Sequence, residues 1–409
     1  MIRLLAILLL FFAQSFDCNS FRSSEKKTQK CVLSNGVNVV LYEDFRMPVV
    51  IVGLIFHTGS FDAPDHQKNI TSIIAENFID EITHKKMLDL GISYDVNVSG
   101  RYTEVIAKMN PKYITKFLQI MCENEFSLKN FNVLKKQLVI NGNLAHNCHQ
   151  NTVYNKVLTE IRYKNFSVDE VFNEEKLASI TFDDVIKYFE KHYKRCHMSI
   201  VVSGAIGYKN LIKVLQSTIC NRPPSEFVSN DVCLNQIFKE IYIENKYVSR
   251  SVRYFYKISS EDMPLERAFF RIFDSELLDF FKKSNAMISD YSCFNIISNG
   301  YCIRQIIFYP KPDVSLVDFQ KAYDIFVDRI CRREIAPDTL KKIKLLDSYA
   351  QQFLSSDLRA VYLKIRDNYL NGLDEKIDIC DTKQFNLFGE RILKQNLILK
   401  IVTKYKPDK

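Results

Sequence analysis

The order of apolar segments in the first half of the chain recurs in the second half, at an offset of about 200 residues. Strand-like residues 41–43 and 49–56 correspond to residues 241–243 and 249–256, and each longer strand leads into a small polar turn. A repeat of this length equals a whole domain. The repeat therefore predicts two copies of one domain.

Each copy is expected to mix helices with antiparallel strands. After the polar turn comes an apolar helix, at 70–82 or 265–281, whose apolar residues recur every three or four positions as a core-facing helix requires. Alternating strands follow at 92–109 and 291–309, and each pair is broken by a Ser-Gly or Asn-Gly turn that suits a hairpin. The other matched elements are a helix at 111–125 and 315–332 and a strand at 198–203 and 397–403, whereas the helix at 208–218 has no counterpart.

The fold class expected is α+β, with two homologous mixed α/β domains in tandem, each an antiparallel-rich sheet packed on helices. A chain of 409 residues with 47% apolar content can bury cores of that size. We expect domains at 25–220 and 236–409, separated by a linker at 221–235 whose two adjacent prolines cannot continue a helix.

The first 20 residues resemble a secretory signal peptide, because Arg3 precedes an unbroken apolar run at 4–12 and small residues follow. That run is too short to span a bilayer comfortably. A mitochondrial presequence would be amphipathic and rich in arginine. We therefore expect the endoplasmic reticulum lumen or secretion, with a mitochondrion or mitochondrion-derived organelle as the alternative, and no transmembrane span once the leader is removed.

Composition argues against several other classes of function. The net charge of +8 comes from dispersed lysines without dense basic blocks, so no nucleic-acid partner is expected. The eleven cysteines form no CxxC pair, which leaves no zinc ribbon or redox motif. The sequence also lacks a glycine-rich phosphate loop and a G-x-S-x-G elbow.

Several short motifs resemble the opening of the insulinase, pitrilysin and mitochondrial processing peptidase family. They are the run at 33–37, Pro48 before an apolar strand, the Gly59-Ser60 turn, Pro64, and the strand ending at 200–204. The resemblance implies a zinc metalloendopeptidase fold made of two similar domains, in agreement with the internal repeat.

In that family the helix after the Gly-Ser turn carries H-x-x-E-H, in which two histidines bind zinc and the glutamate activates water. Placing the motif from Gly59 without gaps puts Ser72 and Glu76 at the histidine positions and Ala75 at the general base. The third-ligand region, 141–143, offers two amides and a glycine instead of a glutamate. The resemblance therefore implies a degenerate site, with no catalytic residue and no zinc cofactor.

The family's second half supplies an arginine and a tyrosine that hold the substrate backbone. Tyr291 matches the tyrosine, whereas the arginine position falls among Lys282, Lys283 and Ser284. Tyr291 is therefore the one substrate-binding residue that the resemblance assigns.

Other histidine and cysteine groups are weaker metal candidates. His146, Cys148 and His149 offer three donors, but their spacing does not place all three on one helical face, so a solvated surface is expected. Cys196-His197 adjoins an apolar strand and is expected to pack in the core.

We interpret the chain as a noncatalytic homologue that serves as an alpha-type subunit or a peptide-binding module. In the family, such chains resemble the alpha subunit of mitochondrial processing peptidase and the core proteins of the bc1 complex. The implied partners are a zinc-bearing homologous subunit and an extended peptide held by strand addition. Two alternatives remain: an active zinc endopeptidase with a rebuilt site, and a solitary lumenal or secreted scaffold.

Overall fold

The computed structural model describes residues 28–60, 62–67, 69–123, 126, 128–146, 174–194, 198–219, 238–245, 249–259, 262–284, 287–298, 301–333, 338–339, 341–342, 345–346, 349, 356–371 and 382–405. The predicted leader, the predicted linker and the candidates Cys148, His149, Cys196 and His197 lie outside these residues. The domain boundaries at 25–220 and 236–409 stay predictions.

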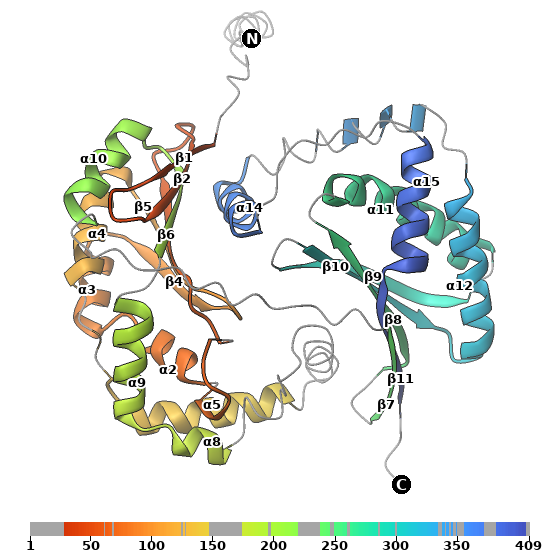
Figure 1. Ribbon diagram of the computed structural model, residues 1–409, viewed down its shortest axis with the longest axis horizontal. Helices are drawn as coiled ribbons and strands as arrows, with labels where there is room; N and C mark the ends of the chain where they lie inside the picture. The colour runs from red at the N-terminus through yellow and green to blue at the C-terminus, as the bar shows by residue number, and fades with distance from the viewer. Residues whose placement is uncertain are drawn as a thin grey trace, which may run out of the picture.

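A six-stranded sheet organises the first half (Figure 1). Its strand order is β1-β2-β6-β3-β5-β4, and every neighbouring pair is antiparallel except β2 and β6. The buried strands are rich in valine and isoleucine, which suits positions covered on both faces. The strands are β1 (Gln29–Val32), β2 (Asn38–Glu43), β3 (Val50–Phe56), β4 (Ser93–Val98), β5 (Thr103–Met109) and β6 (Met198–Gly204).

A five-stranded sheet organises the second half and repeats this topology. Its order is β7-β11-β8-β10-β9, with β7 and β11 as the parallel pair. Strand for strand, this matches β2-β6-β3-β5-β4, so the predicted duplication and fold class are confirmed. The strands are β7 (Lys239–Asn245), β8 (Ser251–Ser259), β9 (Ile288–Ser298), β10 (Tyr301–Pro310) and β11 (Leu397–Tyr405).

Helices cover the outer face of each sheet and enclose two separate apolar cores (Figure 1). The first-half helices are α2 (Ile70–Glu76), α3 (Glu81–Asp89), α4 (Ile114–Glu123), α5 (Phe131–His146), α8 (Glu174–Ser179), α9 (Phe182–Phe189) with a π-helical turn (Glu190–Lys194), and α10 (Tyr208–Thr218). The second-half helices are α11 (Met263–Leu278) with a π-helical turn (Asp279–Ser284), α12 (Leu316–Cys331), α14 (Leu358–Asn371) and α15 (Thr382–Glu390) with a π-helical turn (Arg391–Gln395).

The predicted helix at 70–82 is wrong in one respect, because it is two helices. Asn77 caps the end of α2, where its side-chain amide donates to the Ile73 carbonyl at 3.0 Å. Asp80 then caps α3, accepting from the Thr83 N–H at 2.6 Å. Asparagine and aspartate at these positions favour helix ends over helix interiors.

Helix α14 belongs to the second half in sequence but packs on the inner face of the first sheet (Figure 1). Its residues Val361, Tyr362 and Ile365 form a buried cluster with Ile51 and Val201. The helix also contacts β9 of the second sheet, so it lies between the two halves and ties them together.

A buried polar group fixes this contact. The Tyr362 hydroxyl donates to one carboxylate oxygen of Glu104 at 2.5 Å, and Arg366 donates to the other at 2.8 Å. Gly53 on β3 makes room for the ring, because a Cβ atom there would lie 1.7 Å from the tyrosine oxygen. Gly53, Tyr362 and the Glu104–Arg366 ion pair therefore join α14 to the first sheet.

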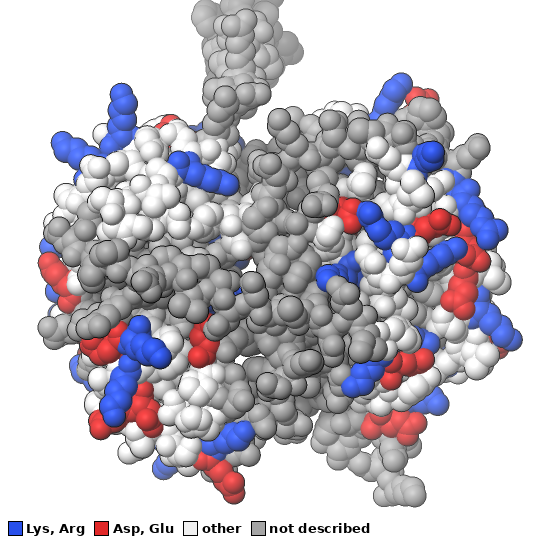
Figure 2. Space-filling view, viewed as in Figure 1, with Lys and Arg blue, Asp and Glu red and all other residues white. Residues whose placement is uncertain are grey.

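Charges of both signs are interspersed on the described surface seen in Figure 2, in keeping with the dispersed lysines of the sequence. Within the described residues, no helix is both long enough and apolar enough to cross a bilayer.

Candidate functional site

The three positions to which the ungapped placement from Gly59 assigns the zinc motif lie on α2. Ser72 and Ala75 are partly buried and Glu76 is exposed. Residues 72 and 76 are one helical turn apart and share a face, which is the spacing that the two zinc-binding histidines need. The backbone arrangement is therefore present, and the side chains differ.

The third-ligand region that the motif placement assigns lies on a helix. Residues 141–143 lie in α5, and α5 contacts α2. The structure thus brings the helix of the predicted third-ligand region into contact with the helix of the predicted motif positions.

The side chains on α2 do not fit zinc. A catalytic zinc site uses three protein ligands of the histidine, cysteine or carboxylate type. Ser72 provides a neutral hydroxyl, Ala75 provides a methyl group and Glu76 provides one carboxylate. Among the residues that the structure describes, no three His, Cys, Asp or Glu side chains gather closely enough to hold a metal ion. We therefore derive no chemical step through zinc.

Strand β4, which contacts α2, is an edge strand of the first sheet. The Ser99 N–H donates to the Tyr102 carbonyl at 2.8 Å and closes the β4–β5 hairpin, as the Ser-Gly turn predicted. Because hydrogen-bonded and non-hydrogen-bonded pairs alternate along an antiparallel ladder, the backbone groups of Tyr94, Val96 and Val98 point away from β5. They form a row of donors and acceptors along the edge.

The side chains of β4 alternate between the core and solvent. Tyr94 and Val96 pack against the first core, whereas Asp95 faces outward and pairs with Arg359 of α14 at 3.4 Å. Both members of this pair are more than half exposed, so it contributes little stability. His84 of α3 shares a 2.8 Å hydrogen bond with the Tyr94 hydroxyl beside the strand.

Sequence reasoning found the alternating strand at 92–109 but not that β4 is an edge. Alternation shows which side chains face the core, but it does not give the order of strands in a sheet. Strand β4 is an edge because β6 pairs with β2 and β3, from which it is separated by about 150 residues, and not with β4.

Tyr291 lies on β9, the corresponding edge strand of the second sheet, and is partly buried. Burial, reinforced by the nearby Asp274 carboxylate, raises the pKa of Tyr291 to about 12, so the phenol stays protonated at neutral pH. Lys282, Lys283 and Ser284 end the π-helical turn after α11. The structure thus places Tyr291 on an edge strand of the second sheet, whereas α2 packs beside β4 of the first sheet.

An arginine that the motif comparison did not assign lies near Tyr291. Arg304 of β10 pairs with the buried Glu266 at 3.1 Å and stacks on the Phe270 ring, whose centroid is 4.4 Å away. Its Nη2 also lies 2.9 Å from the Cys293 sulfur. The register of β9 against β10 creates this cluster, which linear spacing does not reveal.

His57 also gains partners that spacing did not predict. Its Nε2 lies 2.7 Å from the Ser199 hydroxyl, which lies 2.7 Å from the Tyr369 hydroxyl of α14. This histidine therefore belongs to the contact between α14 and the first sheet.

Comparison with known proteins identifies the fold. No protein-family model and no curated protein matches the chain. Among solved structures, a protease from Helicobacter pylori is 15% identical with a TM-score of 0.76, covering 93% of this chain and 100% of that one. An inactive domain of an M16 peptidase from Pseudomonas fluorescens is 10% identical with a TM-score of 0.74, covering 94% and 99%.

A chain of complex III from Candida albicans is also similar, at 14% identity and a TM-score of 0.71, covering 91% of this chain and 95% of that one. These likenesses span both halves and confirm, at the level of fold, the resemblance that the opening motifs indicated. The chain therefore has the two-domain fold of the M16 peptidases.

Proposed function

We propose that this chain is a noncatalytic M16-fold protein that holds an extended peptide along β4. The proposal rests on an edge strand that lies beside α2, together with predicted zinc-motif positions whose side chains can neither bind zinc nor activate water. Strand addition needs only backbone donors and acceptors, and β4 has both. Side chains of a bound peptide would alternate between α2 and the exposed face around Asp95.

Val96→Pro tests this role, and we expect it to weaken peptide binding by about tenfold. Proline removes an N–H that points away from β5, so a bound peptide loses one backbone hydrogen bond while the β4–β5 ladder is kept. Binding is measured on an array of short peptides with the full chain. The matched control, Val96→Ala, shortens the same side chain but keeps the N–H and should bind nearly as well as the wild type. Equal weakening by both variants would show that peptide binding depends on the Val96 side chain and not on the backbone N–H at the edge of β4.

The likeness to a complex III chain supports a second part of the proposal, that this chain works beside a homologous subunit. Affinity purification of the tagged chain tests it. Recovery of a second M16-fold chain that carries H-x-x-E-H is the expected result. Recovery of a monomer with no such companion would favour the solitary scaffold.

The secretory leader stays a prediction. Sequencing of the mature N-terminus checks it.

A further inference from the structure

Three connecting segments of the first half meet at one end of its sheet. Gly204 of β6 pairs with Glu43 of β2 and with Val50 of β3. Val50 in turn pairs with Met109 of β5. The segments 43–49, 108–116 and 204–213 therefore lie side by side. We call them the basic end of the first half, because their charged side chains are six Lys or Arg and two Asp or Glu.

The two acids of the basic end are already bound within the protein. Asp44 accepts from the Arg46 guanidinium at 2.9 Å, and Glu43 accepts from the Tyr208 N–H at the start of α10 at 2.7 Å. Six cations against two acids leave a net charge of +4, which is half of the +8 of the whole chain. Half of the excess positive charge is thus concentrated at one end of one sheet.

The lysines of the basic end face solvent. All five are exposed, and none forms an ion pair with another residue that the structure describes; they are Lys108, Lys112, Lys116, Lys209 and Lys213. Helices α4 and α10 both begin here, and a helix N-terminus carries partial positive charge. The neighbouring connection at 90–92 is uncharged and follows Asp89. Figure 2 shows Lys and Arg side chains projecting from the surface over α10, at the upper left.

Two large apolar side chains lie on the β2–β3 loop of the basic end. Phe45 and Met47 are 65% and 56% exposed and flank Arg46 in the sequence. The loop has a defined shape, because both the N–H and the guanidinium of Arg46 donate to the buried Asp44 carboxylate. Phe45 and Met47 are therefore held in water by an ordered loop.

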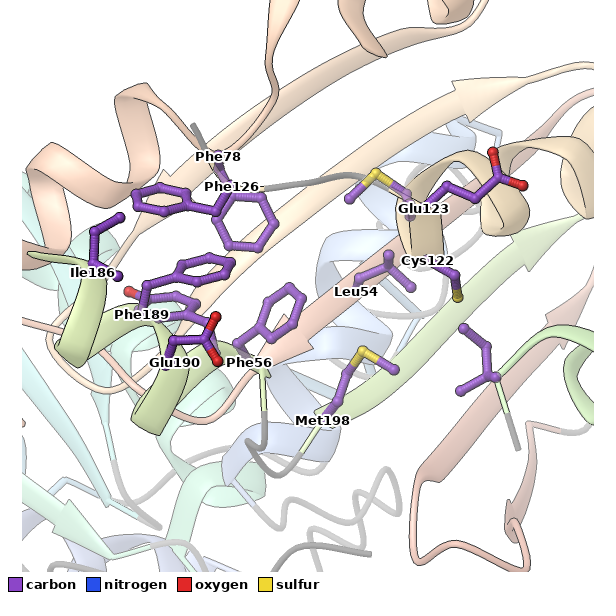
Figure 3. A pocket seen from close by; sticks show the side chains of 13 residues that line it. Leu54, Phe56, Phe78, Cys122, Glu123, Phe126, Ile186, Phe189, Glu190 and Met198 are labelled. Atoms are coloured by element: carbon purple, nitrogen blue, oxygen red, sulfur yellow. The ribbon is translucent and has the colours of Figure 1, made fainter. Parts of the chain in front are cut away.

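The opposite end of the same sheet treats its aromatic residues differently. Phe56 ends β3 there and is 3% exposed, beside an apolar cavity whose lining includes Phe126 and Phe189 (Figure 3). The protein itself covers Phe56, whereas it leaves Phe45 and Met47 uncovered. A single exposed apolar residue is ordinary, but two on one short loop beside exposed lysines indicate a surface that meets something else.

A membrane fits this combination better than a protein partner does. A stable protein interface takes about 800 Å² from each partner and has an apolar centre. The basic end offers only two apolar side chains, on one loop, with exposed lysines on the neighbouring segments. At a membrane, a few apolar side chains among the headgroups act together with Lys and Arg near an anionic surface.

We propose that the basic end docks on an anionic phospholipid surface. Phe45 and Met47 insert among the headgroups, while Lys112, Lys116 and Lys209 lie against the negatively charged lipids. None of these five residues belongs to β4, so the proposal is independent of the proposed peptide binding.

Phe45→Trp tests the insertion, because the chain contains no tryptophan and the new indole is the only one present. With vesicles of phosphatidylcholine that contain about 30% phosphatidylserine, its emission should shift to shorter wavelength, and brominated acyl chains should quench it. Vesicles of phosphatidylcholine alone should leave the emission unchanged. The matched control is Ile325→Trp on α12, a position that is 62% exposed in the second half, and it should respond to neither vesicle. An unshifted spectrum of Phe45→Trp with the anionic vesicles would overturn the proposal.

Sedimentation of the full chain with the same anionic vesicles tests the lysines. Lys112→Ala with Lys209→Ala should weaken binding about thirtyfold, from about fivefold for each lysine near an anionic surface. The matched control is Lys321→Ala with Lys383→Ala, which removes the same charge from exposed positions of the second half and should change binding by less than about twofold. Equal losses in the two pairs would show an effect of net charge alone and would reject the basic end as the docking surface.

The apolar contribution is measured in the same assay. Phe45→Ser with Met47→Ser should weaken binding about tenfold, while circular dichroism stays that of the wild type because both side chains are exposed. Wild-type binding by this folded double variant would reject insertion of the loop. No binding of the wild type to either vesicle would overturn the proposal and favour an acidic protein as the partner of this surface.

Discussion

Gly53→Ala is expected to loosen the contact between the two halves, at a cost of about 3 kcal/mol. The new methyl group would lie 1.7 Å from the Tyr362 oxygen and 3.2 Å from a Glu104 carboxylate oxygen. Tyr362 must then move, which disturbs a carboxylate that is 1% exposed and depends on Tyr362 and Arg366. Amide hydrogen exchange of α14 and β3 measures the effect, and both segments should exchange faster.

A double-mutant cycle separates this clash from any general effect of alanine in a strand. Gly53 has no positive φ angle, so alanine is compatible with its backbone and should be neutral or slightly stabilising once the ring is gone. We therefore expect Gly53→Ala to cost about 3 kcal/mol less in a Tyr362→Ala background than in the wild type. Additive effects would show that the two residues do not meet, and the account of the interface would fail.

Ser72→His together with Glu76→His is expected to create a zinc site on α2. The two side chains would share one helical face, the arrangement that the family uses. Zinc at about 100 times the dissociation constant should stabilise the folded double variant by about 2.7 kcal/mol. The measurement is the thermal midpoint with and without zinc, and the wild type should respond much less.

The two single variants are the controls for this gain. Each supplies one histidine, so each should respond to zinc much less than the pair. No cleavage is expected from the double variant, because Ala75 still occupies the position of the general base. If the pair responds no more than the single variants, residues 72 and 76 are not the positions that correspond to the motif.

Much of the fold could be predicted from the sequence because the chain contains it twice. Apolar alternation located β4 and β5, and the three- and four-residue spacing located α11. The break inside 70–82 was missed because the apolar pattern continues across it, while the polar caps Asn77 and Asp80 decide where each helix ends. Local capping thus overrode an otherwise regular pattern.

The site was only partly predictable, for a different physical reason. Substitutions at Ser72, Ala75 and Glu76 are visible in one short stretch and need no tertiary information. The exposed edge of β4, the contact of Tyr362 with Glu104 and the cluster around Arg304 join residues distant in sequence or on different elements. Such contacts follow from sheet order and register, which periodicity does not determine.

The most direct test of the central claim is the zinc content of the purified full chain, measured together with peptide cleavage in the presence and absence of a chelator. The account predicts substoichiometric zinc and peptides that are bound but recovered intact. One zinc ion per chain, with cleavage that the chelator abolishes, would contradict it and establish an active peptidase with a rebuilt site.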